Sequence, residues 1–161
     1  MQRKNSETKK ESIAQVATNI FLEKGYKNTS LQDIAQAVGI TKAGIYHYYK
    51  TKEEILYHIL ASYDTTNTET FKAIRIEFEN ADLDPKTALK MFIRAYAKIS
   101  LNKQNVNLLG LRERDQLTGM NRKNYRKIQH GIFERLKKDI SRIPNLKTSL
   151  DLNTMVFMII S

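Results

Sequence analysis

The sequence SLQDIAQAVGITKAGIYHYYKTKEEIL occupies residues 30–56 and contains the start and stop signals of two short helices. Ser30 followed by Asp33 has the spacing of a capping box, so a helix is expected to begin directly after Ser30. Gly39 is expected to end it, because glycine readily adopts the left-handed conformation that follows a helix. Thr41 is suited to cap a further helix of about two turns. Two short helices joined by a tight turn form a helix-turn-helix.

The helical pattern continues on both sides of this stretch. Thr8 and Glu11 have capping-box spacing, and Gly25 is a stop signal. Between them lies an apolar stripe at helical spacing, made of Ile13, Val16, Ala17, Ile20 and Phe21. After the stretch, Thr51 and Glu54 form a second predicted capping box, which opens a long helix.

Longer helices are expected beyond about residue 80. Asp84 followed by Pro85 is a cap with proline at the first helical position. Apolar stripes then cover residues 89–99 and 125–143, with a further helical segment around 106–117. Residues 151–160 are expected to form a last, apolar helix. The chain is therefore predicted to be all-α, with a three-helix N-terminal helix-turn-helix module joined to a larger C-terminal helical bundle.

The composition restricts the classes of protein to consider. The chain has 161 residues, 41% of them hydrophobic, which is enough for a compact core. It has no cysteine, which excludes disulfides and thiolate metal sites. Neither a secretory signal nor an apolar run of about 20 residues occurs, so a soluble, cytoplasmic protein without a membrane partner is expected. The formal net charge of +10 favours a polyanionic partner, although a protein can be basic without one.

The second helix of a helix-turn-helix enters the major groove of DNA, and its first turn faces the base edges. Ile45 and Tyr49 fall on the inward side of this region, so both are expected in the core. The first turn itself contains small or flexible groups, namely Thr41, Lys42, Ala43 and Gly44. These groups allow a close approach to DNA.

The next residues are suited to hold phosphates. Tyr46, His47 and Tyr48 carry hydroxyls or ring nitrogens that can reach phosphate oxygens. Lys50 and Lys52 flank the start of the following helix, whose N-terminal amides also favour an anion. Each ring also has a simpler interpretation, with the tyrosines as packing aromatics and His47 as a surface histidine.

Residues 21–56, FLEKGYKNTSLQDIAQAVGITKAGIYHYYKTKEEIL, closely resemble the signature of the TetR family of bacterial transcriptional repressors. The resemblance covers roughly residues 10–57 and agrees in residue type and spacing at many positions together. It implies DNA contacts at Thr29, Ser30, Lys42, Ala43, Gly44, Tyr46, His47 and Lys52. The basic segment with Arg3, Lys4, Lys9 and Lys10 resembles the flexible arm of that family, and a solvated tail explains it equally well.

The resemblance also implies that two parts of the chain have different functions. Residues 1–52 are expected to bind DNA, and residues 53–161 to bind a ligand and form a homodimer on a near-palindromic operator. Ligand binding would then shift the fourth helix and lower the affinity for DNA. The end of the sequence at Ser161 departs from the family pattern, because a final helix is expected there; this puts the dimer interface in doubt.

The segment LLGLRERDQLTGMNRKNYRKIQ, residues 108–129, resembles the Leu-Arg-Glu-Arg segment of family members that respond to acyl-coenzyme A thioesters. Guanidinium groups suit phosphate oxygens, and an apolar cavity beside them would hold an acyl chain. The predicted ligand contacts are Phe92, Tyr96, Leu108, Arg112, Arg114, Arg122 and Arg126. The alternative is a solvated charged face beside ordinary core.

Other classes of function find little support. Catalysis needs convergent acid, base or nucleophile groups, and His47, His58 and His130 are isolated in the sequence. No catalytic residue, metal site or cofactor is predicted. A DNA-bound adaptor of the same fold, controlled by a protein partner, stays open as an alternative. Membrane binding through the basic helix after residue 121 is weaker, because that helix has a stripe suited to a bundle core.

Overall fold

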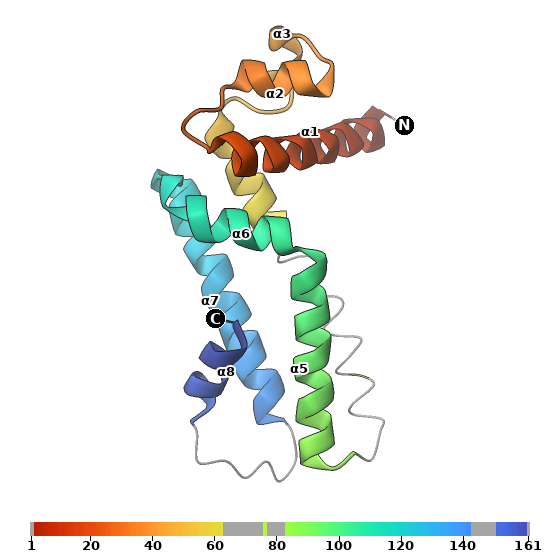
Figure 1. The fold of residues 1–161 in the computed structure, drawn as a ribbon, viewed down its shortest axis with the longest axis vertical. Coiled ribbons are helices and arrows are strands. Elements are labelled where there is room, and N and C mark those ends of the chain that lie inside the picture. Colours follow the sequence, from red (N-terminus) through yellow and green to blue (C-terminus); the bar gives the residue numbers. More distant parts are fainter. Residues whose placement is uncertain (1, 63–75, 77–82, 143–150, 161) are drawn as a thin grey trace. The chain divides into compact units, whose positions relative to one another are not determined.

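The computed structural model describes residues 2–62, 76, 83–142 and 151–160, and every regular element within them is a helix (Figure 1). This confirms the all-α prediction. A helix over residues 52–62 follows the helix-turn-helix. The other helices are α1 (Gln2–Lys24), α2 (Leu31–Val38), α3 (Lys42–Ile45), α5 (Pro85–Asn102), α6 (Gln104–Glu113), the short 3₁₀ helix η1 (Arg114–Gln116), α7 (Gly119–Ser141) and α8 (Leu152–Ile160).

The chain divides into two compact units that do not follow the order of the sequence. The first unit joins Met1–Tyr63 to Gln104–Tyr125, and the second joins Asp64–Lys103 to Arg126–Ser161. The first unit therefore holds α1, α2 and α3 together with α6, η1 and the start of α7. The predicted functional boundary after residue 52 stays a prediction. None of the helices in the described ranges is long and apolar enough to cross a membrane.

The core of the first unit combines the helix-turn-helix with segments that are distant in sequence. The stripe of α1 contributes Ile13, Ala17 and Phe21, all nearly inaccessible to solvent. Leu109 from α6 and Leu117 after η1 are fully buried in the same cluster. Because buried apolar area is the main source of stability, the helix-turn-helix and α6 stabilise each other.

The capping signals of the helix-turn-helix are confirmed. The Ser30 hydroxyl accepts from the Asp33 amide at 3.1 Å, and the Asp33 carboxylate accepts from the Ser30 amide at 2.7 Å. Gly39 has a φ of 73° and closes α2, a conformation that favours glycine. The Thr41 hydroxyl accepts from the Gly44 amide at 3.0 Å and so starts α3. The short-range chemistry of these residues sets the ends of both helices.

The start of α1 differs from the sequence-based expectation. The helix begins at Gln2, so Thr8 and Glu11 lie inside it, and the predicted capping box there is wrong. The residues before Thr8 are mainly good helix formers, which extend the helix toward the N-terminus. The backbone of the basic segment around Arg3 is helical as well and forms the start of α1; its role as an arm on DNA stays a prediction.

The capping of helix 52–62 differs in one bond from the predicted box. The Thr51 hydroxyl accepts from the Glu54 amide at 3.1 Å, as expected. The Glu54 carboxylate, however, accepts from the amide of Lys50 at 2.6 Å, one residue earlier than in a standard capping box. The side chains of Thr51 and Glu54 therefore both bond to the backbone at the helix start.

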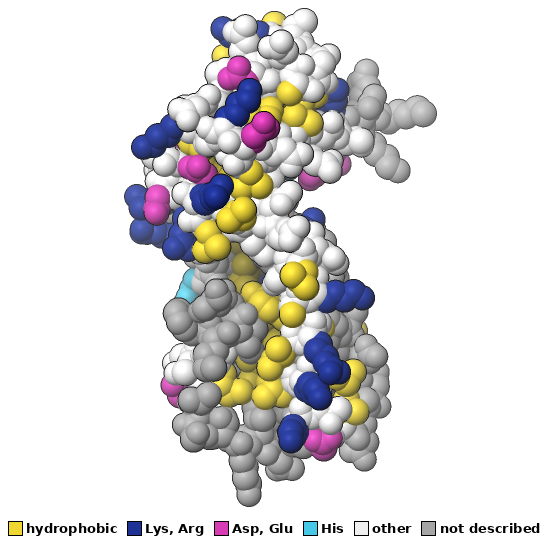
Figure 2. All heavy atoms as spheres, viewed as in Figure 1, with side chains coloured by type: hydrophobic (Ala, Val, Ile, Leu, Met, Phe, Trp, Pro, Cys, Tyr) yellow, Lys and Arg dark blue, Asp and Glu magenta, His cyan; other side chains and the backbone are white. Residues whose placement is uncertain are grey.

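The second unit has its own apolar core. Asp84 caps α5 by accepting from the amides of Lys86 and Thr87, each at 3.1 Å, and Pro85 takes the first helical position. Apolar side chains gather between α5 and the later part of α7 (Figure 2). The buried members of this core are Phe92, Leu136, Ile140, Met155 and Val156. Residue 143, the last of the apolar stripe predicted over residues 125–143, lies outside the described residues.

Candidate nucleic-acid interface

The first turn of α3 is anchored to the core by a buried side chain, and its other side is exposed to solvent. Ile45 is fully buried and confirms the predicted inward anchor. Thr41, Lys42 and Ala43 are exposed, and Gly44 is half-buried. A Cβ added at Gly44 would lie 3.2 Å from the Thr41 hydroxyl oxygen, which is a tight contact. Glycine at this position therefore suits the closely packed cap of α3.

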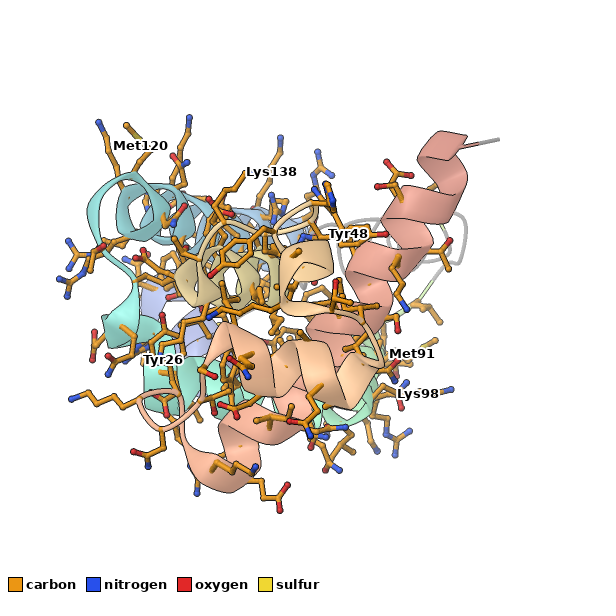
Figure 3. The ribbon with its side chains drawn as sticks, turned by 90° about the horizontal axis from the view of Figure 1, so that it is seen from above. Tyr26, Tyr48, Met91, Lys98, Met120 and Lys138 are labelled. Atoms are coloured by element: carbon orange, nitrogen blue, oxygen red, sulfur yellow. The ribbon has the colours of Figure 1, made fainter. Side chains whose placement is uncertain are left out.

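The aromatic residues after α3 separate into exposed and buried groups. Tyr46 is 39% exposed and His47 is exposed, whereas Tyr48 is half-buried beside α3 (Figure 3). Tyr49 is buried, and its hydroxyl donates to the carbonyl of Lys10 at 3.2 Å. Burial raises the pKa of Tyr49, so this hydroxyl keeps its proton at neutral pH. Tyr49 thus belongs to the core, as predicted, and Tyr46 and His47 are accessible to a partner.

The residues before α2 are less accessible than the sequence suggested. Thr29 is only 2% exposed, and its hydroxyl donates to the Gly25 carbonyl at 2.9 Å. Ser30 is exposed, and its hydroxyl is engaged with the Asp33 carboxylate at 2.6 Å. The side chain of Thr29 therefore stabilises the loop between α1 and α2, while Ser30 lies at the surface where α2 begins.

Lys52 has a different environment from the one that was expected. Its ammonium donates to the backbone carbonyls of Tyr26, Lys27 and Thr29 at 2.7, 3.2 and 2.8 Å. It also lies 4.4 Å from the centre of the Tyr26 ring, within cation–π range. In this structure the Lys52 side chain binds the α1–α2 loop, and its phosphate contact stays a prediction.

The Leu-Arg-Glu-Arg segment contacts the helix-turn-helix module. Glu113 accepts from the backbone amide of Tyr26 at 3.4 Å, and Arg112 donates to the Leu22 carbonyl at 3.5 Å. Burial, together with the carboxylates of Glu53 and Glu113, raises the pKa of Tyr26 to about 12. The end of α6 is thus bonded to the end of α1 and the loop after it. Sequence reasoning missed these contacts, because nothing local links residues so far apart.

A second link joins helix 52–62 to the start of α7. Glu53 accepts from the Thr118 amide at 2.8 Å, the Thr118 hydroxyl at 3.0 Å and the Asn121 side-chain amide at 3.2 Å. The hydrogen bond from the Thr118 amide is the main reason that the pKa of Glu53 lies below its ordinary value. A carboxylate at a helix N-terminus is also favoured by the helix dipole. Sequence reasoning missed Glu53, because its partners Thr118 and Asn121 lie 65 and 68 residues away along the chain.

The Glu53→Gln variant is expected to lose about 1 kcal/mol of stability at neutral pH, because it removes the charge from these hydrogen bonds. The pKa of Glu53 is lower in the folded state than in the unfolded chain. Its contribution is therefore complete above the unfolded pKa of about 4.3 and is lost as the pH falls through the folded pKa. Thermal melts between about pH 7 and pH 3 measure this dependence. Identical pH profiles for Glu53→Gln, wild type and the exposed control Glu23→Gln would contradict the assignment.

The seven predicted ligand contacts fall into two groups, one in each unit. In the second unit Phe92 is buried, Tyr96 is half-buried and Arg126 is exposed. In the first unit Leu108, Arg112, Arg114 and Arg122 are all exposed. Arg122 lies 3.7 Å from Asp115, an exposed ion pair. The ligand site stays a prediction. In the described part of the chain, no group of three or more His, Asp or Glu side chains is arranged to hold a metal ion.

Comparison with known proteins gives a consistent family. Residues 13–59 match the model of the bacterial regulatory proteins of the tetR family. The chain is 48% identical over 46 residues to the biofilm operon icaADBC negative transcriptional regulator IcaR of Staphylococcus epidermidis, which is 29% of this chain and 25% of the relative. It is 34% identical over 87 residues to the uncharacterized transcriptional regulator YerO of Bacillus subtilis, covering 54% of this chain and 29% of the relative. The matched segments thus span less than a third of these curated relatives.

Solved structures share the fold over most of the chain. The TetR family transcriptional regulator PfmR from Thermus thermophilus superposes with a TM-score of 0.78 at 28% identity, covering 92% of this chain and 79% of PfmR. AibR, solved in complex with isovaleryl coenzyme A and operator DNA, gives a TM-score of 0.75 at 22% identity, covering 94% and 81%. These relatives are regulators of transcription, which is not an enzymatic class.

Proposed function

We propose that this chain, whose residues 13–59 belong to the TetR family of bacterial regulatory proteins, is a cytoplasmic transcriptional repressor that binds a near-palindromic operator as a homodimer. The observation that carries the proposal is the first turn of α3. Its exposed Lys42 and Ala43 are fixed by the buried Ile45 and the Thr41 cap. A helix presented in this way fits the major groove of DNA.

The residues around α3 have distinct proposed roles. Lys42 and Ala43 meet base edges, and Gly44 permits a close approach. The polar groups that surround this turn hold phosphates and set the position of the helix along the duplex. These groups are Ser30, Thr41, Tyr46, His47 and Tyr48. We assign DNA binding to residues 1–52 and effector binding and dimerisation to residues 53–161.

The proposed effector is an acyl-coenzyme A thioester. AibR, which shares the fold, was solved with isovaleryl coenzyme A and operator DNA. In this chain the second unit supplies apolar side chains around Phe92, which suit an acyl group. Arg126 belongs to the same unit and is exposed, so its guanidinium group is accessible to phosphates.

Contacts within the first unit support a proposed route for the response. Helix 52–62 follows the helix-turn-helix directly and bonds to the start of α7 through Glu53. Leu109 and Leu117 attach α6 and η1 to the same core. A change in α6 or α7 on effector binding would therefore displace helix 52–62 and alter the position of α3.

The test combines a thermal-shift titration with DNA binding. Isovaleryl and long-chain acyl-coenzyme A are compared with free coenzyme A and free fatty acid, and a duplex is selected from a random library. A ligand at 100 times its Kd adds about 2.7 kcal/mol to the native state. We expect a larger thermal shift for a thioester than for free coenzyme A or free fatty acid. We also expect the thioester to release the selected duplex. Duplex selection without any thioester shift would favour control by a protein partner, and failure to select a duplex would contradict the repressor proposal.

A further inference from the structure

We propose that Lys52 is a positioning residue that holds the α1–α2 loop in the shape needed for DNA binding, and that it contacts no phosphate itself. The inference rests on the proposed DNA-binding function and deepens it. It concerns a lysine among the predicted DNA contacts whose ammonium lies among backbone carbonyls within the first unit.

The geometry accounts for every hydrogen-bond donor of the side chain. An ammonium group has three N–H donors and no acceptor. The Lys52 ammonium has three carbonyl partners, those of Tyr26, Lys27 and Thr29, at 2.7, 3.2 and 2.8 Å. The ammonium nitrogen also lies 4.4 Å from the centre of the Tyr26 ring, whose negative face attracts the charge. A phosphate contact would require at least one of these bonds to break.

The three carbonyls belong to the segment that sets the start of α2. Gly25, with a φ of 84°, turns the chain at the end of α1, and Ser30 caps α2 five residues later. Between them the backbone makes few bonds to itself, such as the one from the Thr29 amide to the Tyr26 carbonyl at 3.3 Å. By binding three carbonyls, Lys52 joins this segment to the first turn of helix 52–62. The position of Ser30 and of α2 therefore depends on Lys52.

The cluster of carbonyls suits lysine better than arginine. An ammonium is a compact charge whose donors point in three directions, which matches three converging carbonyls. A guanidinium is planar and has five donors in a fixed fork, so it cannot satisfy the same set without leaving donors unpaired. A phosphate, in contrast, is bound well by either side chain. The exchange of lysine for arginine therefore separates the two roles.

The experiment measures Lys52→Gln and Lys52→Arg against wild type, with Lys50→Gln as the matched control for the melting temperature. Lys50 is exposed, and its ammonium donates to the carbonyl of Tyr46 at 2.9 Å, within its own stretch of chain. Binding to a mixed-sequence duplex is followed by fluorescence anisotropy between about 50 and 200 mM salt. Thermal melting of each free protein is recorded in parallel.

A positioning role predicts that both Lys52 variants bind roughly tenfold more weakly at each salt concentration, melt at lower temperature, and keep the wild-type salt slope. Lys50→Gln is expected to melt like wild type. A phosphate contact instead predicts a slope reduced by about one, unchanged melting, and rescue by arginine. That second pattern would overturn the proposal.

Failure to fold does not remove the test. If both Lys52 variants are unfolded while Lys50→Gln is folded, the structural role of Lys52 is supported. A residue whose only role is to contact phosphate would not affect the folding of the free protein. If wild type binds no duplex, the DNA-binding function fails. The melting temperatures then decide separately whether Lys52 holds the loop.

Discussion

Leu109→Ala is expected to lower the free energy of unfolding of the first unit by about 2–5 kcal/mol, the range for truncating a buried leucine. Leu109 is fully buried among the residues that support the helix-turn-helix. Alanine would leave a cavity between α6 and that core, and the surrounding helices can relax only in part. Since a domain of this size is stable by about 5–15 kcal/mol, the loss is a large fraction of the total.

Leu111→Ala, two positions further along α6, provides the matched control. Leu111 is 70% exposed, so the same truncation is expected to change stability by less than about 0.5 kcal/mol. Chemical denaturation of both variants measures the difference. Because Leu109 shares a core with Ile45, we also expect weaker DNA binding by Leu109→Ala at temperatures where it begins to unfold. Equal effects of the two substitutions would show that α6 does not support the helix-turn-helix core.

Lys42→Ala is expected to reduce the discrimination between the selected operator and other duplexes by about 1–3 kcal/mol, the range for one base contact. Lys42 is exposed in the first turn of α3, which the buried Ile45 holds in place. Removing its ammonium should therefore change which sequences are preferred. Anisotropy titrations on operator and mixed-sequence duplexes measure the ratio of the two affinities.

Tyr46→Phe is the companion variant, because it removes only a hydroxyl from a side chain that is 39% exposed. If that hydroxyl binds phosphate, affinity should fall by a similar factor on all duplexes and the preference should stay the same. Lys98→Ala, which removes an exposed positive charge from α5, controls for the loss of charge alone. Unchanged affinity and preference in both the Lys42 and Tyr46 variants would contradict the assignment of this surface to DNA.

The helix-turn-helix was predictable because its signals are local. Ser30 and Asp33 bond to each other across a single turn, Gly39 takes up a left-handed conformation by itself, and Thr41 bonds to Gly44. Such contacts need no information from distant parts of the chain. The spacing of Ile45 and Tyr49 likewise sufficed to place them in the core, since helical periodicity fixes the face of each side chain.

The interactions of single polar side chains were not predictable in this way. Thr29 and Lys52 have the residue types of phosphate contacts, yet one is buried and the other binds carbonyls. The partners of Lys52 lie more than 20 residues away along the chain. Those of Glu53 and Glu113 lie more than 60 residues away. Lysine and glutamate side chains are flexible, and they occur on solvated faces as readily as in specific contacts. Their positions in the sequence therefore do not identify a partner.

The helices, most of their caps, the helix-turn-helix and the similarity of residues 13–59 to the tetR family could be read from the sequence alone, because each depends on patterns within a few turns of chain. Only the tertiary structure decided that α6 and the start of α7 share a unit with the helix-turn-helix. It also decided that Lys52 and Glu53, neighbours in sequence, bind two different segments. The physical reason is that burial and hydrogen bonding between distant segments depend on how whole helices pack, which no short stretch of sequence specifies.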